Sequence, residues 1–400
     1  MLFADLPVDY KQTFGRYTYL FKCIGLDFFD NSTGFICWNN VKFILFCSAF
    51  YPFIFTQFTL ISKIRADNFL ESVRVVPVDI MFAHALFRRA DLRDMIMEVG
   101  ELWPRNLAAD DQKAIILKAW LRQIKIPLDL FFIFAMTNLS LFEVIPFLIS
   151  CFNLVRGDKV YLFPFQAPSF WEVDSIISYL LTYVWELAGT VPCQMCLYLP
   201  FDIIIVVMTS NVSALLRLLQ VDLKNVIKLR DEQNKSKNHL NISDDQSYEE
   251  LRRIVDIHQR LLRIADQLTS IFGLVIFIHV AFAALEICFF GFLTMVYGGL
   301  AETIANMLTV LNAVFTIFLL SLSGQFLCDT SSEVADAAYE SYWYESDCKV
   351  KLILFIIIRA QRPSHLSALG FSQLTLKSFS KIMSSAWTYF SLLIQMYEET

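Results

Sequence analysis

Long apolar runs, separated by polar and charged connections, dominate the chain. A hydrocarbon core of about 30 Å requires about 20 helical residues. Seven runs are near or above that length, so we predict seven membrane-spanning helices: Trp38–Ile61, Ser72–Phe87, Ile126–Phe152, Ser175–Val207, Thr269–Tyr297, Glu302–Leu327 and Thr375–Tyr397. The second is the weakest, because it holds Arg74, Pro77 and Asp79. Continuous apolar runs favour helices over strands, whose apolar residues alternate.

Two of the polar connections also show a helical pattern. Between the fourth and fifth spans, apolar residues recur at helical spacing on both sides of a polar break at Asn234–Asp245. We expect two helices there that extend the neighbouring spans beyond the membrane. Leu352–Ile358 is apolar but too short to span, and basic residues flank it. We predict that it forms the core of a packed helical layer on the cytosolic side.

The last predicted span has two different faces when its residues are placed at 100° intervals. One stripe consists of Ser378, Lys381, Ser385, Thr388, Leu392 and Met396, and the opposite face of Phe379, Met383, Trp387, Phe390, Ile394 and Tyr397. A polar stripe that ends in two bulky apolar side chains is typical of a pore wall with a hydrophobic constriction. The alternative is that this stripe packs against other helices.

Composition supports a protein that is dissolved in lipid. Hydrophobic residues make up 56% of the 400 residues and charged residues 18%, against about 45–50% and about 25% in soluble domains. We expect no secretory signal, because the first long apolar run begins only after residue 34. The slightly acidic balance gives no indication of a nucleic acid partner.

Basic residues set the predicted orientation, since Lys and Arg concentrate in cytosolic connections. With a cytosolic amino terminus, 28 of the 33 Lys and Arg residues fall in inner connections or at inner span ends. The outer side keeps Lys63, Arg65, Arg74, Arg156 and Lys159. We therefore predict a cytosolic amino terminus and an extracellular carboxyl terminus, the reverse of a G-protein-coupled receptor.

A series of motifs runs through the last part of the chain. It consists of Tyr339, Trp343, Arg359-Ala-Gln-Arg-Pro363, Leu366, Gly370-Phe371, Leu374, Phe379 and Thr388-Tyr-Phe-x-Leu-Leu393, with His258-Gln-Arg-Leu-Leu262, Phe272 and Phe163-Pro-Phe165 upstream. This series resembles insect odorant receptors. The number of spans and their orientation also fit that family, so the resemblance covers almost the whole chain.

The resemblance implies a subunit of an odorant-gated, non-selective cation channel that forms a heterotetramer with the olfactory co-receptor. Because the chain lacks the long insertion of the co-receptor, it resembles an odour-tuning subunit. The implied pore and gate residues are Leu392, Met396, Gln395, Thr388 and Ser385. The implied assembly residues are Tyr339, Trp343, Arg359, Arg362 and Phe371. We expect localisation in the plasma membrane, surrounded by lipid, in the dendrites of olfactory sensory neurons.

The expected fold is an all-α membrane protein in six segments. They are a cytosolic segment (1–37), spans one to four with the odorant pocket in their outer half (38–210), a cytosolic helical extension (211–268), spans five and six (269–327), a cytosolic anchor and assembly layer (328–374), and the pore-lining seventh helix with a short outer tail (375–400).

A volatile ligand offers mainly shape and dispersion contacts, so we expect a closed apolar pocket in the outer half of the bundle. The resemblance places it among the second to sixth spans. Predicted contacts are Phe82, Phe142, Tyr179, Tyr183, Phe282, Glu286 and Met307. The alternative is that the aromatic residues among them only pack in the core.

Four carboxyl residues, Asp79, Glu143, Glu186 and Glu286, lie within predicted spans. A charge there costs roughly 2.5–3.5 kcal/mol, so each is expected to be protonated or paired. We favour neutral structural groups over ligand contacts. If they contact the ligand, the odorant should carry a hydrogen-bond donor, as an indole or a phenol does.

Other functional classes fit the sequence less well. A G-protein-coupled receptor is disfavoured by the orientation and because no span holds Asp-Arg-Tyr or Asn-Pro-x-x-Tyr. A transporter is disfavoured because inverted repeats are not evident. The five His residues are scattered across different segments. We therefore expect neither an enzyme, a metal site nor a cofactor.

Overall fold

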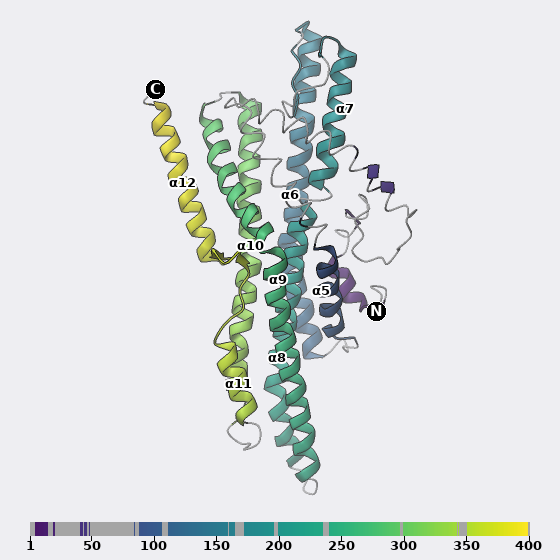
Figure 1. The fold of residues 1–400 in the computed structure, drawn as a ribbon, viewed down its shortest axis with the longest axis vertical. Coiled ribbons are helices and arrows are strands. Elements are labelled where there is room, and N and C mark those ends of the chain that lie inside the picture. Colours follow the sequence, from purple (N-terminus) through teal and green to yellow (C-terminus); the bar gives the residue numbers. More distant parts are fainter. Residues whose placement is uncertain are drawn as a thin grey trace.

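The computed structural model of the chain describes residues 5–14, 19–20, 41–42, 44–45, 48, 84, 88–105, 111–158, 160–164, 172–195, 199–234, 240–296, 299–341, 343 and 350–398. These residues are almost all helical (Figure 1). The helices are α1 (Val8–Phe14), α5 (Arg89–Leu102), α6 (Gln112–Arg156), α7 (Ile176–Cys193), α8 (Leu199–Asn234), α9 (Leu240–Val296), α10 (Leu300–Glu340), α11 (Val350–Ala360) and α12 (Leu376–Glu398). A two-stranded antiparallel turn, β1 (Ser367–Ala368) with β2 (Ser372–Gln373), precedes α12.

Four described helices are long and apolar enough to cross a membrane. They are α6 and the stretches Leu199–Asn225 of α8, Tyr248–Val296 of α9 and Thr303–Glu340 of α10. Each exceeds the length that a bilayer requires, so each extends beyond the hydrocarbon core. The predicted all-α membrane fold is confirmed. The first two predicted spans lie almost entirely outside the described residues.

The range predicted as one fourth span, Ser175–Val207, contains α7 and the beginning of α8, and residues 196–198 between them lie outside the described residues. The α7 helix starts with a capping box, in which Ser175 Oγ accepts a hydrogen bond from the Ser178 amide at 3.1 Å. Pro192 lies in its last turn and Pro200 in the first turn of α8. Proline lacks an amide hydrogen, so Pro192 cannot donate a hydrogen bond within its helix.

The α8 helix is the centre of the bundle. In the most apolar 18-residue stretch of α8, 100% of the residues are buried, whereas in the corresponding stretch of α6 only 6% are buried. The α9 and α10 helices pack on α8 and on each other. The α12 helix stands at one side of the bundle against α9 and α10, away from α6 and α7 (Figure 1). The apolar surface of α6 is therefore available to lipid.

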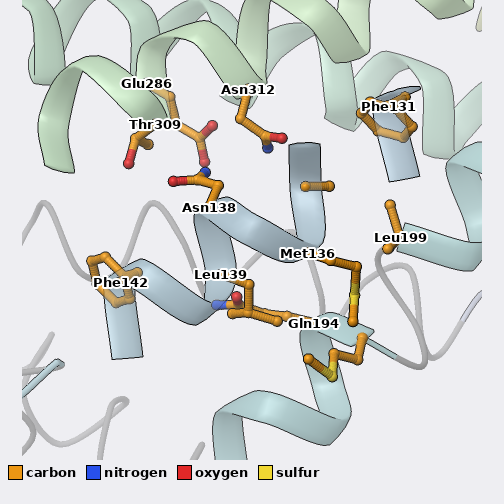
Figure 2. Close-up of a pocket in the computed structure, with 12 residues that line it drawn as sticks. Phe131, Met136, Asn138, Leu139, Phe142, Gln194, Leu199, Glu286, Thr309 and Asn312 are labelled. Carbon is orange, nitrogen blue, oxygen red and sulfur yellow. The ribbon is translucent and has the colours of Figure 1, made fainter. Parts of the chain in front are cut away.

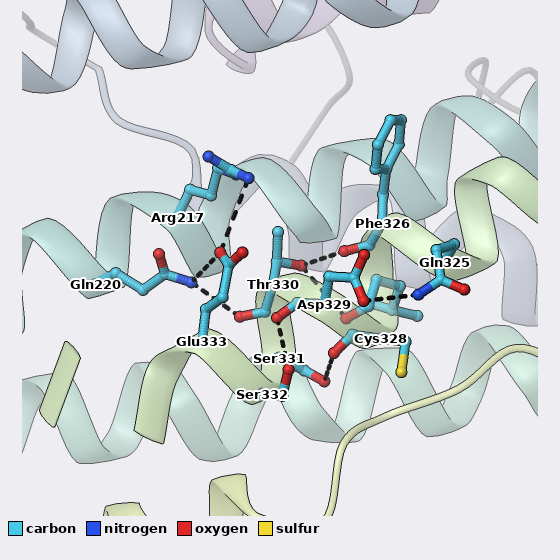
Figure 3. A network of polar contacts seen from close by, with 11 residues as sticks. Arg217, Gln220, Gln325, Phe326, Cys328, Asp329, Thr330, Ser331, Ser332 and Glu333 are labelled. Carbon is cyan, nitrogen blue, oxygen red and sulfur yellow. Dashed lines mark hydrogen bonds and ion pairs between the residues drawn. The ribbon is translucent and has the colours of Figure 1, made fainter. Parts of the chain in front are cut away.

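Below the apolar segments, polar contacts join α8 to α10 (Figure 3). Gln220 Nε2 donates a hydrogen bond to the Thr330 carbonyl at 2.9 Å, and the Arg217 guanidinium lies 3.8 Å from the Glu333 carboxylate. The same guanidinium lies 4.4 Å from the centre of the Trp120 ring. Partly exposed pairs of this kind stabilise a fold only modestly, so we assign their main effect to the register between the two helices.

The α11 helix covers this part of α10, with Ile353 and Ile356 buried. The turn that follows is held by a hydrogen bond from the Ser364 amide to Ser331 Oγ at 2.9 Å. The range Leu352–Ile358, predicted as the core of a helical layer, thus lies in a helix that packs on the bundle.

Two glycines allow the β1–β2 turn to approach the bundle closely. A Cβ atom on Gly273 of α9 would lie 3.2 Å from the Ser367 carbonyl oxygen, and one on Gly324 of α10 would overlap the Leu374 carbonyl oxygen. At the tip of the turn, Gly370 has φ 79°, a left-handed conformation that glycine adopts without strain. The start of α12 is therefore seated on both α9 and α10.

Candidate functional site

A cavity of about 120 Å³ lies where α6, the end of α7, the start of α8, α9 and α10 meet (Figure 2). It is lined by Phe131, Ala135, Met136, Asn138, Leu139, Phe142, Gln194, Met195, Leu199, Glu286, Thr309 and Asn312. Mostly apolar walls with a few polar groups are typical of small-molecule sites.

Four of the five polar side chains of the cavity lie close together, and the fifth, Gln194 at the end of α7, lies beside Leu139 (Figure 2). Figure 2 shows Asn138 of α6, Glu286 of α9 and Thr309 and Asn312 of α10 close together. Thr309 Oγ1 donates its hydrogen to the carbonyl of Ala305 at 3.1 Å. Asn312 Oδ1 is buried, and among the described residues no hydrogen-bond partner reaches it. The cavity thus has a polar end and an apolar end.

The structure brings Phe142 and Glu286, two of the predicted ligand contacts, to this cavity. Phe282 lies one turn before Glu286 on α9 and is half-buried, and Met307 on α10 is 52% exposed. Neither is among the lining residues. Phe82 lies outside the described residues.

Tyr179 and Tyr183, also predicted as ligand contacts, belong to a separate aromatic cluster. Tyr161 stacks on Tyr179 with ring centres 4.7 Å apart, and the rings of Tyr179 and Tyr183 are 5.6 Å apart. The Tyr179 hydroxyl donates to the carbonyl of Leu162 at 3.2 Å. This cluster attaches the connection after α6 to α7. The structural role that we considered as the alternative is therefore the one that the packing supports for both tyrosines.

The carboxyl residues of the spans have different positions. Glu143 of α6 is 6% exposed and accepts a hydrogen bond from Thr190 Oγ1 of α7 at 3.1 Å. Glu186 of α7 is fully buried in the same helix pair. Asp79 lies outside the described residues. Among the four, Glu286 is the one that the structure places in the wall of the cavity.

Several polar residues of the bundle were not predicted. Asn138, Thr309 and Asn312 line the cavity, and Asp202 of α8 lies 3.0 Å from His279 of α9, with both side chains buried. The available signal was a polar residue inside an apolar run, at positions three residues apart for Thr309 and Asn312 and thus on one helix face. Amide and hydroxyl groups are less conspicuous in an apolar run than carboxyl and aromatic groups are.

The α12 helix contacts the bundle with one face only. Phe379 packs edge-on against Phe318 of α10 at 5.7 Å, and Phe390 lies beside Gly291 of α9. On the predicted pore stripe, Leu392 is 51% exposed and Met396 61% exposed. The other predicted pore residues, Ser385, Thr388 and Gln395, are exposed as well. The stripe therefore belongs to the surface of α12 that this subunit does not cover, together with Trp387 and Tyr397 of the predicted opposite face.

The seat of α12 is a small apolar cluster, which we name the α12 seam. It consists of Ala283 and Ile287 of α9, Ala313 and Ile317 of α10, and Phe379, Ile382 and Met383 of α12. Asn312 of the cavity directly precedes Ala313, and Glu286 directly precedes Ile287. The helices that carry the polar end of the cavity thus also carry α12.

The predicted assembly residues are mainly exposed. Tyr339 at the end of α10 is 69% exposed and Phe371 at the tip of the β1–β2 turn is 81% exposed. Arg359 and Arg362 are exposed, and the Arg359 guanidinium donates to the Arg362 carbonyl at 2.8 Å. Trp343 is partly buried against the core. The arginines also border a polar hollow of about 600 Å³ between α9 and the turn after α11.

His258 of α9 belongs to the motif His258-Gln-Arg-Leu-Leu262. It is buried near Arg359. Burial disfavours the charged imidazolium, and the nearby Arg359 guanidinium acts in the same direction, so the pKa of His258 falls from 6.5 to about 4. The side chain is therefore neutral at cellular pH.

Comparisons with known proteins agree with these features. The profile of the 7tm odorant receptor family matches residues 66–387. The chain is 29% identical to Odorant receptor 49a of Drosophila melanogaster over 158 residues, which is 39% of this chain and 40% of that receptor. It is 24% identical to Odorant receptor 67a of the same organism over 393 residues, which is 94% of each protein. The first of these relatives is thus covered over less than half of its length.

Two solved structures have the same fold. One is the insect olfactory receptor OR5 from Machilis hrabei in complex with eugenol, with a TM-score of 0.79 and 14% identity over 97% of this chain and 99% of that chain. The other is a second structure of this olfactory receptor, with a TM-score of 0.80 and 15% identity over 97% of this chain and 100% of that chain. At these identities the likeness establishes the fold.

Proposed function

Since the chain belongs to the 7tm odorant receptor family, whose profile matches residues 66–387, we propose that it is the odour-sensing subunit of a ligand-gated, non-selective cation channel. The channel is a heterotetramer with the olfactory co-receptor. It lies in the plasma membrane, with the amino terminus in the cytosol and the carboxyl terminus outside, in the dendrites of olfactory sensory neurons.

The odorant site is the cavity between α6 and α10. The cavity is small, and seven of its twelve lining residues are apolar, which suits a volatile ligand with an apolar body and a polar group. Glu286 and Thr309 lie at middle to outer depth of the predicted fifth and sixth spans, so the cavity is level with the outer half of the bundle. An insect olfactory receptor of the same fold was solved in complex with eugenol, which supports an odorant as the ligand class.

One observation carries the link between ligand and pore: α9 and α10 hold both the polar end of the cavity and the α12 seam. A ligand shifts a conformational equilibrium by its difference in affinity for the two states. An odorant that contacts Glu286 and Asn312 best when α9 and α10 are slightly displaced therefore favours the state in which α12 has moved with them.

The gate is formed by Leu392 and Met396 on the exposed face of α12. Around a pore axis, bulky apolar side chains from each subunit exclude water and thereby block ions until the helices separate. Ser385, Thr388 and Gln395 line the wall of the same pore. The cytosolic layer around Tyr339, Trp343, Arg359, Arg362 and Phe371 joins the subunits.

The proposal is tested by co-expression of the chain with the co-receptor and by whole-cell recording during application of a broad odorant panel. Cells with the co-receptor alone are the control. We expect a cation current that requires this chain and that persists when G-protein signalling is blocked. An odorant response that needs G proteins would support the alternative of a G-protein-coupled receptor. Odorant uptake without current would support a transporter.

A further inference from the structure

The polar end of the cavity offers more acceptors than donors. The Thr309 hydroxyl gives its hydrogen to Ala305 on its own helix, so its oxygen lone pairs are what it presents to the cavity. Asn312 Oδ1 is buried, and nothing in the described part of the chain donates to it. The Glu286 carboxyl group adds two oxygens (Figure 2). Because a buried acceptor without a partner is costly, this end favours a ligand that brings a hydrogen-bond donor.

The donors at the same end are amide groups. Asn138 and Asn312 each carry an NH₂ group, which needs an acceptor. A hydroxyl group can donate to an oxygen of Glu286 or Asn312 and accept from an amide at the same time. An aldehyde, ketone, ester or ether only accepts. An ammonium group only donates and also brings a full charge out of water, which is costly. A hydroxyl group therefore satisfies more of these groups than the others do.

The other end of the cavity limits the body of the ligand. Phe131, Leu139, Phe142 and Leu199 line it together with two methionines and Gln194. The volume of about 120 Å³ is slightly below that of engineered apolar cavities of about 150 Å³ that hold one benzene molecule. A single aromatic ring, or an alkyl chain of similar volume, is therefore the expected upper size unless the cavity expands.

We propose that this receptor selects small hydroxyl-bearing odorants, alcohols or phenols whose apolar body is no larger than about one aromatic ring. The hydroxyl lies among Glu286, Asn312 and Asn138, and the apolar body lies against Phe131, Leu139 and Phe142. The proposal rests on the channel function proposed above and specifies the ligand class of the same site.

The test compares odorants that share an apolar body and differ in the polar group: p-cresol with p-methylanisole, benzyl alcohol with benzaldehyde and benzylamine, and hexanol with hexanal. Concentration–response curves are recorded from cells that express this chain with the co-receptor. We expect the hydroxyl compound of each set to act at a roughly 10- to 100-fold lower concentration, the factor expected from an unpaired buried acceptor. Naphthol should be weaker than p-cresol because of its second ring.

Substitutions of cavity residues test which side chains cause the preference for hydroxyl compounds. Asn312→Leu removes the unpaired acceptor, and Glu286→Gln replaces one acceptor oxygen by a donor, so each should reduce the ratio between hydroxyl and carbonyl compounds toward one. Thr309→Val keeps the side-chain shape and removes its oxygen, so it carries the same test if the other variants do not reach the cell surface. Phe142→Leu at the apolar end is the matched control. It should shift both members of a pair alike and leave their ratio unchanged.

The outcomes separate this inference from the proposed function. Strong currents in which ethers, aldehydes or amines match or exceed the hydroxyl compounds would overturn the ligand class and leave the channel function standing. Unchanged ratios in surface-expressed Asn312→Leu, Glu286→Gln and Thr309→Val would also overturn it. An absence of current with every compound, while both subunits are at the cell surface, would overturn both proposals.

Discussion

Glu143 and Glu286 carry the same functional group in one helical bundle, yet their surroundings give them different roles. Glu143 is buried between α6 and α7, where Thr190 donates to it. Glu286 lies in the wall of a cavity with two asparagines and a threonine (Figure 2). A buried carboxyl group is stabilised by hydrogen bonds to its oxygens, and at Glu143 the Thr190 hydroxyl supplies one to Oε1. At Glu286 the carboxyl group lies in the wall of a cavity, where it can contact the polar group of a ligand.

Leu392 is the residue for which the account makes the most direct single-site prediction. Leu392→Ser should introduce a cation current in the absence of odorant, because a hydroxyl group wets a constriction that an isobutyl group keeps dry. Leu393→Ser is the matched control, since that leucine is the next residue and lies off the stripe; it should produce no resting current. Surface labelling confirms assembly of both variants. A normal resting current in assembled Leu392→Ser channels would argue strongly against the gate.

For single residues, the sequence predicted which side chains have functional chemistry better than it predicted which side chains lie next to each other. Phe142 and Glu286 were predicted because an aromatic or acidic residue in a span is noticeable, and both line the cavity. Tyr179 and Tyr183 have the same character, but they pack on the connection after α6. Periodicity shows which face of a helix is apolar; it does not show which other helix that face meets. That is why Asn312, on α10, was not associated with Glu286 on α9.

Among the helices, α12 depends most on its neighbours for its position. Its packed face contacts α9 and α10, and its start is placed by the β1–β2 turn, which lies against Gly273 and Gly324. Because packed helices shift between discrete arrangements and do not deform continuously, a displacement of α9 relative to α10 would be transmitted to α12 at both places.

Gly324→Ala should therefore destabilise the subunit by about 1–3 kcal/mol, the usual cost of overpacking. The new Cβ would overlap the backbone carbonyl of Leu374, which cannot move without displacing the turn. Gly291→Ala is the matched control, because its Cβ would lie 3.3 Å from the ring of Phe390, a side chain that can adjust. Thermal denaturation of the purified channel measures both. Equal stability of the two variants would contradict the proposed role of the turn.

The elements themselves were largely predictable. The helical pattern before the fifth span predicted a continuation beyond the membrane, and α9 runs without interruption from Leu240 to Val296. The β1–β2 turn was missed. Two-residue strands leave no alternation to detect, and their position is set by contacts with Gly273 and Gly324.

In the molecule as a whole, one helix is covered on all sides and another on one face only. The most apolar 18-residue stretch of α8 is 100% buried, whereas Leu392 on α12 is 51% exposed. Exposed apolar residues on a helix of a membrane protein face lipid or another subunit. Because the exposed stripe of α12 also carries Ser385 and Thr388, we infer that it faces the last helices of the neighbouring subunits around a pore.

The proposed orientation gives a prediction for the complete chain. An epitope tag after residue 400 should be labelled on intact cells, and a tag before Met1 should be labelled only after permeabilisation, because the predicted inner connections hold 28 of the 33 basic residues. For the same reason Asn31, in a glycosylation sequence, should carry no glycan. Labelling of both tags on the same side of the membrane would exclude an odd number of spans.

In the proposed channel, odorant binding and pore opening occur in one protein complex. The most direct measurement is the current through outside-out patches excised from cells that express this chain and the co-receptor, without nucleotides in the pipette. We predict that a small hydroxyl-bearing odorant such as p-cresol opens cation channels in the patch, and that Leu392→Ser patches conduct before odorant is added. Odorant currents that are present in whole cells and lost in every excised patch would contradict the claim.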